Sequence, residues 1–258
     1  MPQYFAYGTT ETGYLARKDK RLARVIERVG HIQREVRPDL FDALMHAIVG
    51  QQIATKAQQT VWARLVLALG EVTPETIDGA ETATLQGVGL SFRKVGYMKG
   101  AARKVLLGEL DVEALRHMDD ASVSAALCRL DGVGVWTAEM LMLFSLQRPN
   151  VLSFGDLAIH RGLRMVYRHK VVSRERFEVY RRRFSPCGSV ASQAVWPGKS
   201  PAALHPEPPG YADHQPPESC PDRSAGFRAP ATTAGQTAGR PAAPAAPAKS
   251  PGSAATRS

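Results

Sequence analysis

The stretch Leu130-Asp131-Gly132-Val133-Gly134-Val135-Trp136-Thr137-Ala138 decides how this chain is organised. Apolar residues recur at helical spacing before it, and good helix formers continue from Trp136 to Leu146 until Pro149 interrupts them. The pattern predicts a helix, a tight glycine hairpin and a second helix, because glycine accepts positive φ in such a bend. Unpaired amide groups at the start of the second helix favour an anion such as a DNA phosphate. A plain helix–helix turn is the commoner meaning of this pattern taken alone.

An aspartate lies 22 residues after Gly134, in the segment Val151-Leu152-Ser153-Phe154-Gly155-Asp156. Together, the hairpin and this aspartate resemble the helix-hairpin-helix/Gly-Pro-Asp superfamily of DNA glycosylases, and most closely its 3-methyladenine DNA glycosylase II branch. The resemblance covers about residues 15 to 192 and implies a two-lobed, all-α DNA glycosylase fold. It is also carried by three further segments, Ala47-Ile48-Val49-Gly50-Gln51-Gln52-Ile53, Gly89-Leu90-Ser91-Phe92-Arg93-Lys94-Val95 and, more weakly, Phe184-Ser185-Pro186.

Helical patterns fill most of the chain up to residue 183, and no long run alternates with the two-residue period of a strand. Thr73-Pro74 is typical of a helix start, while Gly30 and Gly70 are typical stops. We therefore predict an all-α domain over residues 1–196, with about ten short helices and few strands. The sequence does not decide whether residues 1–13 pack on the fold or fray. The expected helices cover residues 15–29, 38–53, 55–69, 74–79, 82–86, 95–107, 112–118, 121–129, 136–146, 157–167 and 174–183.

The composition changes after Trp196. Residues 197–258 hold 13 of the 18 prolines, with Ala, Gly and Ser and almost no large aliphatic residues. Such a segment buries too little apolar surface to offset its ordering entropy, so we predict a disordered tail. A natural tail is one explanation. A frameshift is the other, because Gln193-Ala194-Val195-Trp196-Pro197 departs from the family's last helix, and loss of that helix would remove packing from the second lobe.

The net charge is +9, and +7 of it belongs to residues 1–196, because residues 197–258 hold six Lys or Arg and four Asp or Glu. This excess suits a polyanionic partner, although many basic proteins bind none. Cys128, Cys187 and Cys220 are too few for the four-cysteine iron–sulfur loop that some superfamily members carry. We expect no cofactor, because the seven histidines are also dispersed. Without a membrane-spanning run or a signal peptide, a cytoplasmic protein is expected, nucleoid-associated or nuclear.

Asp156 is the residue for which the resemblance implies catalysis. Breaking an N-glycosidic bond builds positive charge on the deoxyribose, and a nearby carboxylate stabilises that charge and can orient or deprotonate the attacking water. The residues alone also favour Asp156 as the N-cap of a helix that begins at Leu157, and both roles can hold together. Phe154-Gly155 departs from the proline-containing sequence usual at this point of the family.

Trp136 bears on the type of reaction. In bifunctional relatives the equivalent residue is a lysine that forms a Schiff base, which an indole cannot do. The resemblance therefore implies a monofunctional enzyme that uses water. The indole face could also stack on an extruded base, and an electron-rich ring suits the positive charge of alkylated purines. A core tryptophan is the alternative.

Several residues are predicted to contact DNA. Gln52 lies where the family fills the gap left by a flipped nucleotide, and Ser91, Arg93 and Lys94 match a second, phosphate-contacting loop. Surface amides and a solvated basic turn are the alternatives. The complete predicted set is Gln52, Ser91, Arg93, Lys94, Gly132, Gly134, Val135 and Thr137.

Two further features accompany the hairpin. The resemblance implies that the backbone carbonyls of Cys128, Leu130 and Val133 hold a monovalent cation against the phosphate. A basic cluster follows Asp156, and it is predicted either to support DNA phosphates or to be a solvated face. Its members are Arg161, Arg164, Arg168, Lys170, Arg174, Arg176 and Arg181–Arg183.

These observations predict a monomeric, monofunctional DNA glycosylase acting on double-stranded DNA. It would flip an alkylated purine such as 3-methyladenine or 7-methylguanine and hydrolyse its N-glycosidic bond, as in base excision repair. One alternative is a relative that acts on oxidised or deaminated bases. Another is a helix-hairpin-helix DNA-binding protein without turnover.

Overall fold

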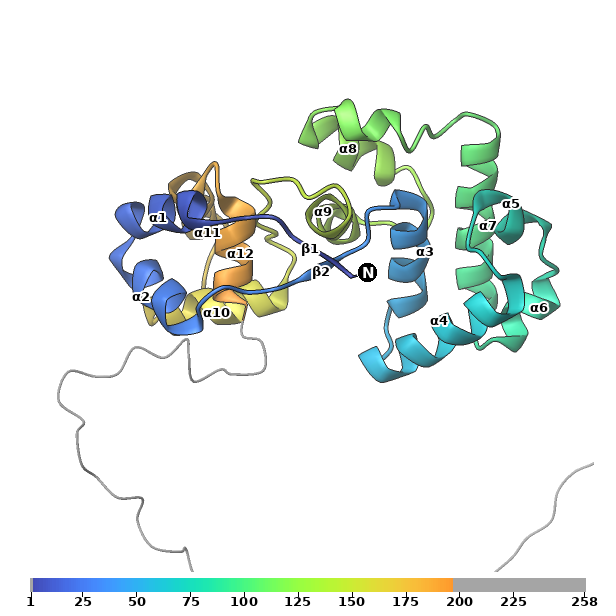
Figure 1. The fold of residues 1–258 in the computed structure, drawn as a ribbon, viewed down its shortest axis with the longest axis horizontal. Coiled ribbons are helices and arrows are strands. Elements are labelled where there is room, and N and C mark those ends of the chain that lie inside the picture. The colour runs from blue at the N-terminus through green and yellow to red at the C-terminus, as the bar shows by residue number, and fades with distance from the viewer. Residues whose placement is uncertain (1, 197–258) are drawn as a thin grey trace, which may run out of the picture. The chain divides into compact units, whose positions relative to one another are not determined.

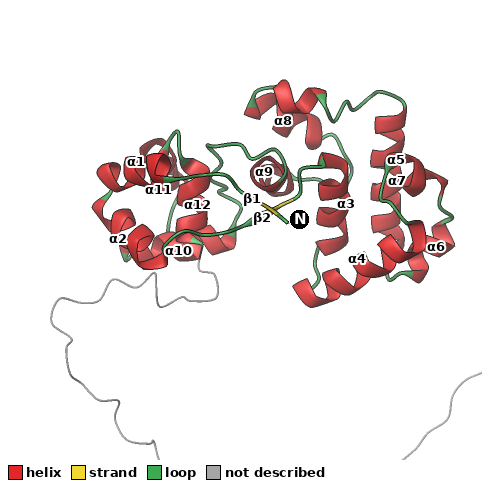
Figure 2. Cartoon of the chain, viewed as in Figure 1, coloured by secondary structure: helices red, strands yellow, loops and turns green. Residues whose placement is uncertain are grey.

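This computed structural model describes residues 2–196, and the predicted tail at 197–258 lies outside the described residues. Helices dominate the described part, and its strands are two short segments, as Figure 2 shows. The all-α prediction is therefore confirmed, with twelve α-helices over residues 2–196 rather than about ten. They are α1 (Thr9–Lys18), α2 (Lys20–Val29), α3 (Leu40–Gly50), α4 (Thr55–Leu69), α5 (Pro74–Gly79), α6 (Thr82–Gly87), α7 (Phe92–Leu106), α8 (Asp120–Leu127), α9 (Val135–Phe144), α10 (Leu157–Tyr167), α11 (Arg174–Phe184) and α12 (Gly188–Val195).

The helices of residues 2–196 pack in two groups. In one, α3 packs on α4 and α7, while α5 and α6 pack on α7. In the other, α2 packs on α1, α10 and α12, and α11 packs on α1 and α12. Figure 1 shows α9 between the two groups, and α9 also packs on α3 and α8. The helix that follows the glycine hairpin is thus central to this part of the chain.

The N-terminal residues pack on the fold. Strand β1 (Gln3–Tyr4) pairs antiparallel with β2 (Glu35–Val36), and Phe5 beyond it is buried. The expected single helix over 15–29 is wrong. The chain forms α1 and α2 instead, because the backbone of Asp19 is extended and ends the first helix. The Asp19 carboxylate then caps α2 by accepting hydrogen bonds from the Arg21 and Leu22 amides.

Other predicted boundaries agree closely with the structure. Asp39 caps α3, Thr73 caps α5 and Gly70 ends α4 with a φ of 77°. Two expectations are wrong: Ile53 lies beyond α3 and is exposed, and residues 112–118 contain only a 3-10 turn, η1 (Ala114–His117). No helix among the described residues is long and apolar enough to cross a membrane.

Helix α12 forms although the sequence departs from the family pattern at Gln193. All eight of its residues are buried, and the helix extends through Val195. Gly162 of α10 allows its close approach, because a Cβ at that position would overlap the Val195 carbonyl group. The departure from the family sequence leaves a buried polar group without hydrogen bonds. Gln193 is 1% exposed, and neither the nitrogen nor the oxygen of its side-chain amide has a hydrogen-bond partner.

Candidate active site

The predicted helix-hairpin-helix is formed by α8, the turn through Gly132 and α9. Asp119 caps α8, and Gly134 precedes the first turn of α9. Gly132 has a φ of 79°, and a Cβ there would lie 2.2 Å from Cδ2 of Tyr97. Both the backbone angle and the close ring therefore require glycine. The first amides of α9 have no partner within the helix, which makes this end suitable for an anion.

The turn after α3 is held against the hairpin by Gln51, next to the predicted Gln52. Gln51 Nε2 donates to the Gly132 carbonyl at 2.7 Å, whereas Gln52 is exposed and has a φ of 58°. From α7, Lys94 Nζ donates to the Val49 carbonyl at 2.7 Å, and burial lowers the pKa of this ammonium. This hydrogen bond joins Lys94 of α7 to the C-terminal end of α3.

The remaining predicted DNA contacts divide between surface and interior. Ser91 is the N-cap of α7, where its side chain accepts from the Lys94 amide, and Arg93 follows it on the surface. Val135 is exposed in the first turn of α9, but Thr137 is buried. Any contact by Thr137 would therefore have to come from its backbone.

Asp156 is the N-cap of α10, as the residue pattern predicted, and only 4% of it is exposed. Its Oδ1 accepts hydrogen bonds from the Ala158 and Ile159 amides at 2.8 and 3.0 Å. Its Oδ2 accepts one from Trp136 Nε1 at 3.0 Å. Three N–H donors from two helices therefore hold both carboxylate oxygens of Asp156 in place.

Trp136 connects the hairpin to Asp156. It lies in the first turn of α9 and is 46% exposed, so it is not a core tryptophan. The loop before Asp156 passes close to it, because a Cβ on Gly155 would lie 3.3 Å from the Trp136 Cβ. The indole N–H is fixed on the carboxylate while much of the side chain stays accessible.

A cavity of about 410 Å³ opens beside α9, and the sequence did not reveal it. Met140 and Phe144 line it, and they share a helix face with Trp136 because they follow it by four and eight residues. That spacing was visible in the sequence. His46 and Arg37 also line the cavity, but they come from α3 and the segment before it, so only the tertiary fold brings them there.

Three polar side chains of this cavity, His46, Gln58 and Arg37, are held by neighbouring groups. Burial and the charge of Arg37 lower the pKa of His46 to about 4, which leaves a neutral imidazole. Gln58 Nε2 lies 3.2 Å from His46 Nδ1 and donates to the His46 carbonyl at 2.9 Å. Arg37 pairs with Asp42 at 2.6 Å and lies over the Trp62 ring. A ligand would therefore meet apolar side chains from α9 on one side and polar side chains such as His46 and Gln58 on the other.

Some arginines of the basic cluster form ion pairs within the fold, and others are exposed on the surface. Arg183 pairs with the buried Asp19 at 2.8 Å, and Arg174 and Arg181 pair with Glu178. These three arginines are therefore structural in part. The exposed members are Arg161, Arg164, Arg168, Lys170, Arg174, Arg176, Arg182 and Arg183.

The carbonyls predicted to hold a monovalent cation lie at the hairpin. Leu130 O accepts the Val133 amide at 3.1 Å, which leaves it a second lone pair, and Lys104 Nζ donates to the neighbouring Arg129 carbonyl. Carbonyl oxygens are the ligand type that hard cations take, so these residues fit such an ion. Among residues 2–196, no group of three His, Cys, Asp or Glu could hold a metal.

Comparison with known proteins identifies the family. Residues 45–186 match the HhH-GPD superfamily base excision DNA repair protein. DNA-3-methyladenine glycosylase 1 of Schizosaccharomyces pombe is 27% identical over 162 residues, which are 60% of this chain and 71% of the relative.

Solved structures agree with this match. The crystal structure of DNA-3-methyladenine glycosidase from Bacillus halodurans aligns with a TM-score of 0.70 and 30% identity, over 79% of this chain and 95% of the other. The S. pombe 3-methyladenine DNA glycosylase in complex with abasic DNA aligns with a TM-score of 0.65 and 25% identity, over 73% and 96% of the two chains. The chain therefore belongs to the HhH-GPD superfamily of base excision DNA repair proteins.

Proposed function

We propose that this chain is a monofunctional DNA glycosylase that hydrolyses the N-glycosidic bond of alkylated purines, such as 3-methyladenine and 7-methylguanine. Its homology to 3-methyladenine DNA glycosylases over most of the described residues supports the reaction and the substrate class. The single observation that carries the proposal is the buried carboxylate of Asp156, held by Trp136 beside an accessible indole face.

The proposed chemistry uses Asp156 as the electrostatic partner of the reacting sugar. As the glycosidic bond breaks, positive charge develops on the deoxyribose, and a preorganised carboxylate stabilises it without rearranging. The same oxygen atoms can orient the water that attacks the sugar. The cationic purine is a good leaving group because its positive charge already weakens the bond, so little help is needed in protonating it.

Trp136 favours water over an amine as the nucleophile. Its indole nitrogen donates to Asp156 and cannot form a Schiff base, which supports hydrolysis without strand cleavage. The cavity lined by Met140 and Phe144 begins one helical turn further along α9 and is of the size of a small-molecule site. It is the proposed receptor for the extruded base.

The proposed substrate is damaged double-stranded DNA, bound by a monomer of the chain. The S. pombe relative was solved with abasic DNA, which supports DNA as the partner. The hairpin amides of Gly134 and Val135 would bind a phosphate, and the exposed Gln52 would occupy the gap in the duplex. A monovalent cation bound by the Cys128, Leu130 and Val133 carbonyls would supply positive charge against the same phosphate.

Asp156→Asn tests the proposed role of the carboxylate. This variant keeps an oxygen for the α10 amides but loses the negative charge, so base release should fall by at least about 100-fold. Release of 7-methylguanine from a methylated duplex, measured under single-turnover conditions, gives the rate. Binding to a duplex with an abasic analogue should change less than about threefold.

The control is Glu75→Gln, which removes a fully exposed carboxylate at the start of α5 and should leave release unchanged. Equal release by wild type and Asp156→Asn would refute the role of Asp156. Duplexes carrying 8-oxoguanine or hypoxanthine test the alternative substrates in the same assay. Binding without release from any duplex would instead favour a DNA-binding protein without turnover.

A further inference from the structure

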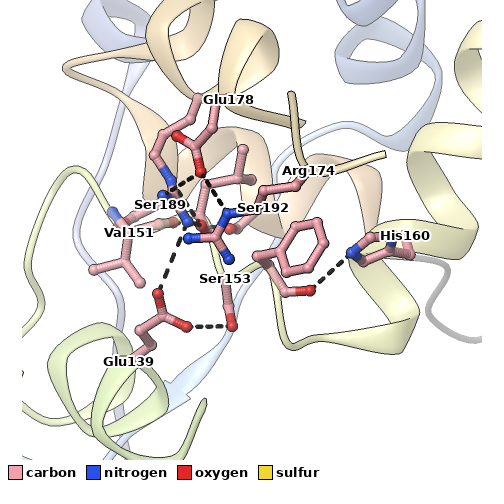
Figure 3. Close-up of polar contacts among 11 residues, drawn as sticks. Glu139, Val151, Ser153, His160, Arg174, Glu178, Ser189 and Ser192 are labelled. Atoms are coloured by element: carbon pink, nitrogen blue, oxygen red, sulfur yellow. Dashed lines mark hydrogen bonds and ion pairs between the residues drawn. The ribbon is translucent and has the colours of Figure 1, made fainter. Parts of the chain in front are cut away.

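Glu139 is a buried carboxylate that the proposed chemistry does not use. It lies one turn along α9 from Trp136, and its side chain is only 16% exposed. Burying a charge is costly unless it is paired and hydrogen-bonded. Its surroundings supply these partners: Ser153 Oγ donates to Oε2 at 2.5 Å, and Arg181 Nη2 lies 4.0 Å from Oε1 (Figure 3).

Opposing effects act on the pKa of Glu139, and their net result is a raised pKa. Burial is the largest influence and raises the pKa of this carboxyl group. The Ser153 hydrogen bond and the charges of Arg181 and Arg174 lower the pKa, while the charge of Asp156 raises it further. The arginines of α11 thus oppose the effect of burial on the Glu139 carboxyl group.

The partner Ser153 belongs to the loop that delivers Asp156. It is fully buried and precedes Asp156 by three residues. Helix α9 thus contacts this segment twice, through Glu139 on Ser153 and through Trp136 on Asp156. Two contacts from one rigid helix fix both the position and the direction of the segment between them.

Helices α10 and α11 also contact this loop. Arg181 donates to the Leu152 carbonyl at 2.8 Å through Nη2 while it pairs with Glu178 at 2.8 Å. Arg174 lies over the Phe154 ring at 4.5 Å, and His160 Nε2 lies 2.7 Å from the Phe154 carbonyl. Figure 3 shows the contact of His160 with this loop as a dashed line.

Helix α12 fixes the start of the loop at Val151. Ser189 Oγ accepts from its amide at 2.9 Å, and Ser192 Oγ donates to its carbonyl at 2.8 Å. The loop from Val151 to Phe154 is therefore tied at each residue. Among these ties, Glu139 of α9 and Arg181 of α11 hold neighbouring loop residues and also lie 4.0 Å from each other.

From this geometry we propose that Glu139, paired with Arg181 and bonded to Ser153, is a positioning residue that holds the Asp156 carboxylate in its reactive place. The inference rests on the proposed function, since the benefit of positioning is a faster chemical step. A reacting group displaced by about 1 Å can slow a reaction by about 100-fold. Glu139 has no contact with the substrate in this role.

The test compares Glu139→Ala and Glu139→Gln in the full chain. Glu139→Ala removes both contacts and should lower single-turnover release of 7-methylguanine by about 10- to 100-fold. Glu139→Gln keeps an oxygen for Ser153 but loses the charge that faces Arg181, so its loss should be smaller. Affinity for a duplex with an abasic analogue should stay within about twofold for both variants, because neither change touches the DNA contacts.

A spectroscopic signal reports the position of Asp156 independently of activity. The indole N–H of Trp136 donates to the Asp156 carboxylate, and Trp136→Phe identifies the NMR cross-peak of this N–H group. In Glu139→Ala the cross-peak should shift, and the indole hydrogen should exchange with solvent about tenfold faster. Ile77→Val, which trims a buried side chain of α5 in the other helix group, is the control for general destabilisation and should change neither the rate nor this peak.

Each outcome decides the proposal. It is overturned if Glu139→Ala releases base at the wild-type rate, if Ile77→Val loses as much rate, or if the whole loss is one of DNA affinity. A wild-type protein that releases no base from any duplex refutes the proposed function instead. In that case the Trp136 cross-peak alone decides the positioning role: a shift in Glu139→Ala supports it, and an unchanged peak overturns it.

Discussion

At the level of single residues, the two carboxylate oxygens of Asp156 have different partners. Oδ1 caps α10, and Oδ2 receives the Trp136 indole N–H. Capping makes the carboxylate immobile, and an immobile charge is what electrostatic stabilisation of a transition state requires. The structural role of this residue as a helix cap is therefore compatible with the catalytic role proposed for it.

His46 predicts a pH dependence of stability. Its pKa is lowered from 6.5 in the unfolded chain to about 4 in the fold, so the unfolded state binds the proton more tightly. Stability should be complete above about pH 6.5 and should fall as the pH drops toward 4. In His46→Gln the free energy of unfolding should fall less over this pH range, by about 1–2 kcal/mol. This difference is smaller than the full pKa shift implies, because His46 is partly exposed to solvent.

Urea unfolding of both proteins between pH 4 and 7 measures this difference. His117→Gln, at an exposed histidine in η1, is the matched control and should follow the wild-type curve. Parallel curves for wild type and His46→Gln would show that His46 does not contribute.

At the level of elements, the hairpin between α8 and α9 depends on Gly132. Alanine there would have to adopt a φ of 79° and would overlap the Tyr97 ring. Gly132→Ala should therefore reduce the free energy of unfolding by at least about 1–2 kcal/mol and weaken binding to undamaged duplex DNA. Chemical denaturation and a fluorescence binding titration measure the two effects.

Gly134→Ala is the matched control for the hairpin. Gly134 has a φ of −100°, and a Cβ there would meet no atom within 4 Å. This variant should change the free energy of unfolding by less than about 0.5 kcal/mol. Similar losses for the two variants would mean that the backbone angle of Gly132 is not what the hairpin requires.

Helix α12 offers a stabilising change. The Gln193 amide is buried without a partner, which costs about 1–3 kcal/mol for such a group. Gln193→Leu has a similar volume and no polar atoms, so it should raise the free energy of unfolding by about 1–3 kcal/mol and the melting temperature by about 3–8 °C. Gln86→Leu, on the exposed surface of α6, should give no such gain. A destabilised Gln193→Leu protein would contradict this account of α12.

At the level of the whole molecule, α9 organises the described residues. Its first turn carries the hairpin amides and Trp136, its next turn carries Glu139 and Met140, and its end lines the cavity through Phe144. The proposed DNA contact, carboxylate partner, positioning residue and base receptor therefore lie along one helix. A single rigid element fixes their spacing, which is why the hairpin sequence is so informative.

Local signals predicted most elements because they act within a few residues. The caps at Asp39, Thr73 and Asp156 and the stop at Gly70 need only nearby backbone. The same reasoning failed around Asp19. The helical pattern of apolar residues continues across Asp19, but the Asp19 carboxylate caps the following helix, α2. The same carboxylate pairs with Arg183, which is 164 residues away in the sequence.

The sequence by itself determined the helical class, the glycine hairpin and the helix cap at Asp156, because periodicity, capping and positive φ are properties of neighbouring residues. Only the tertiary structure decided that Trp136 donates to Asp156, that Glu139 and Arg181 hold its loop, and that His46 faces the cavity. These contacts join separate helices, and their energies depend on burial and distance. A local sequence pattern specifies neither of these quantities.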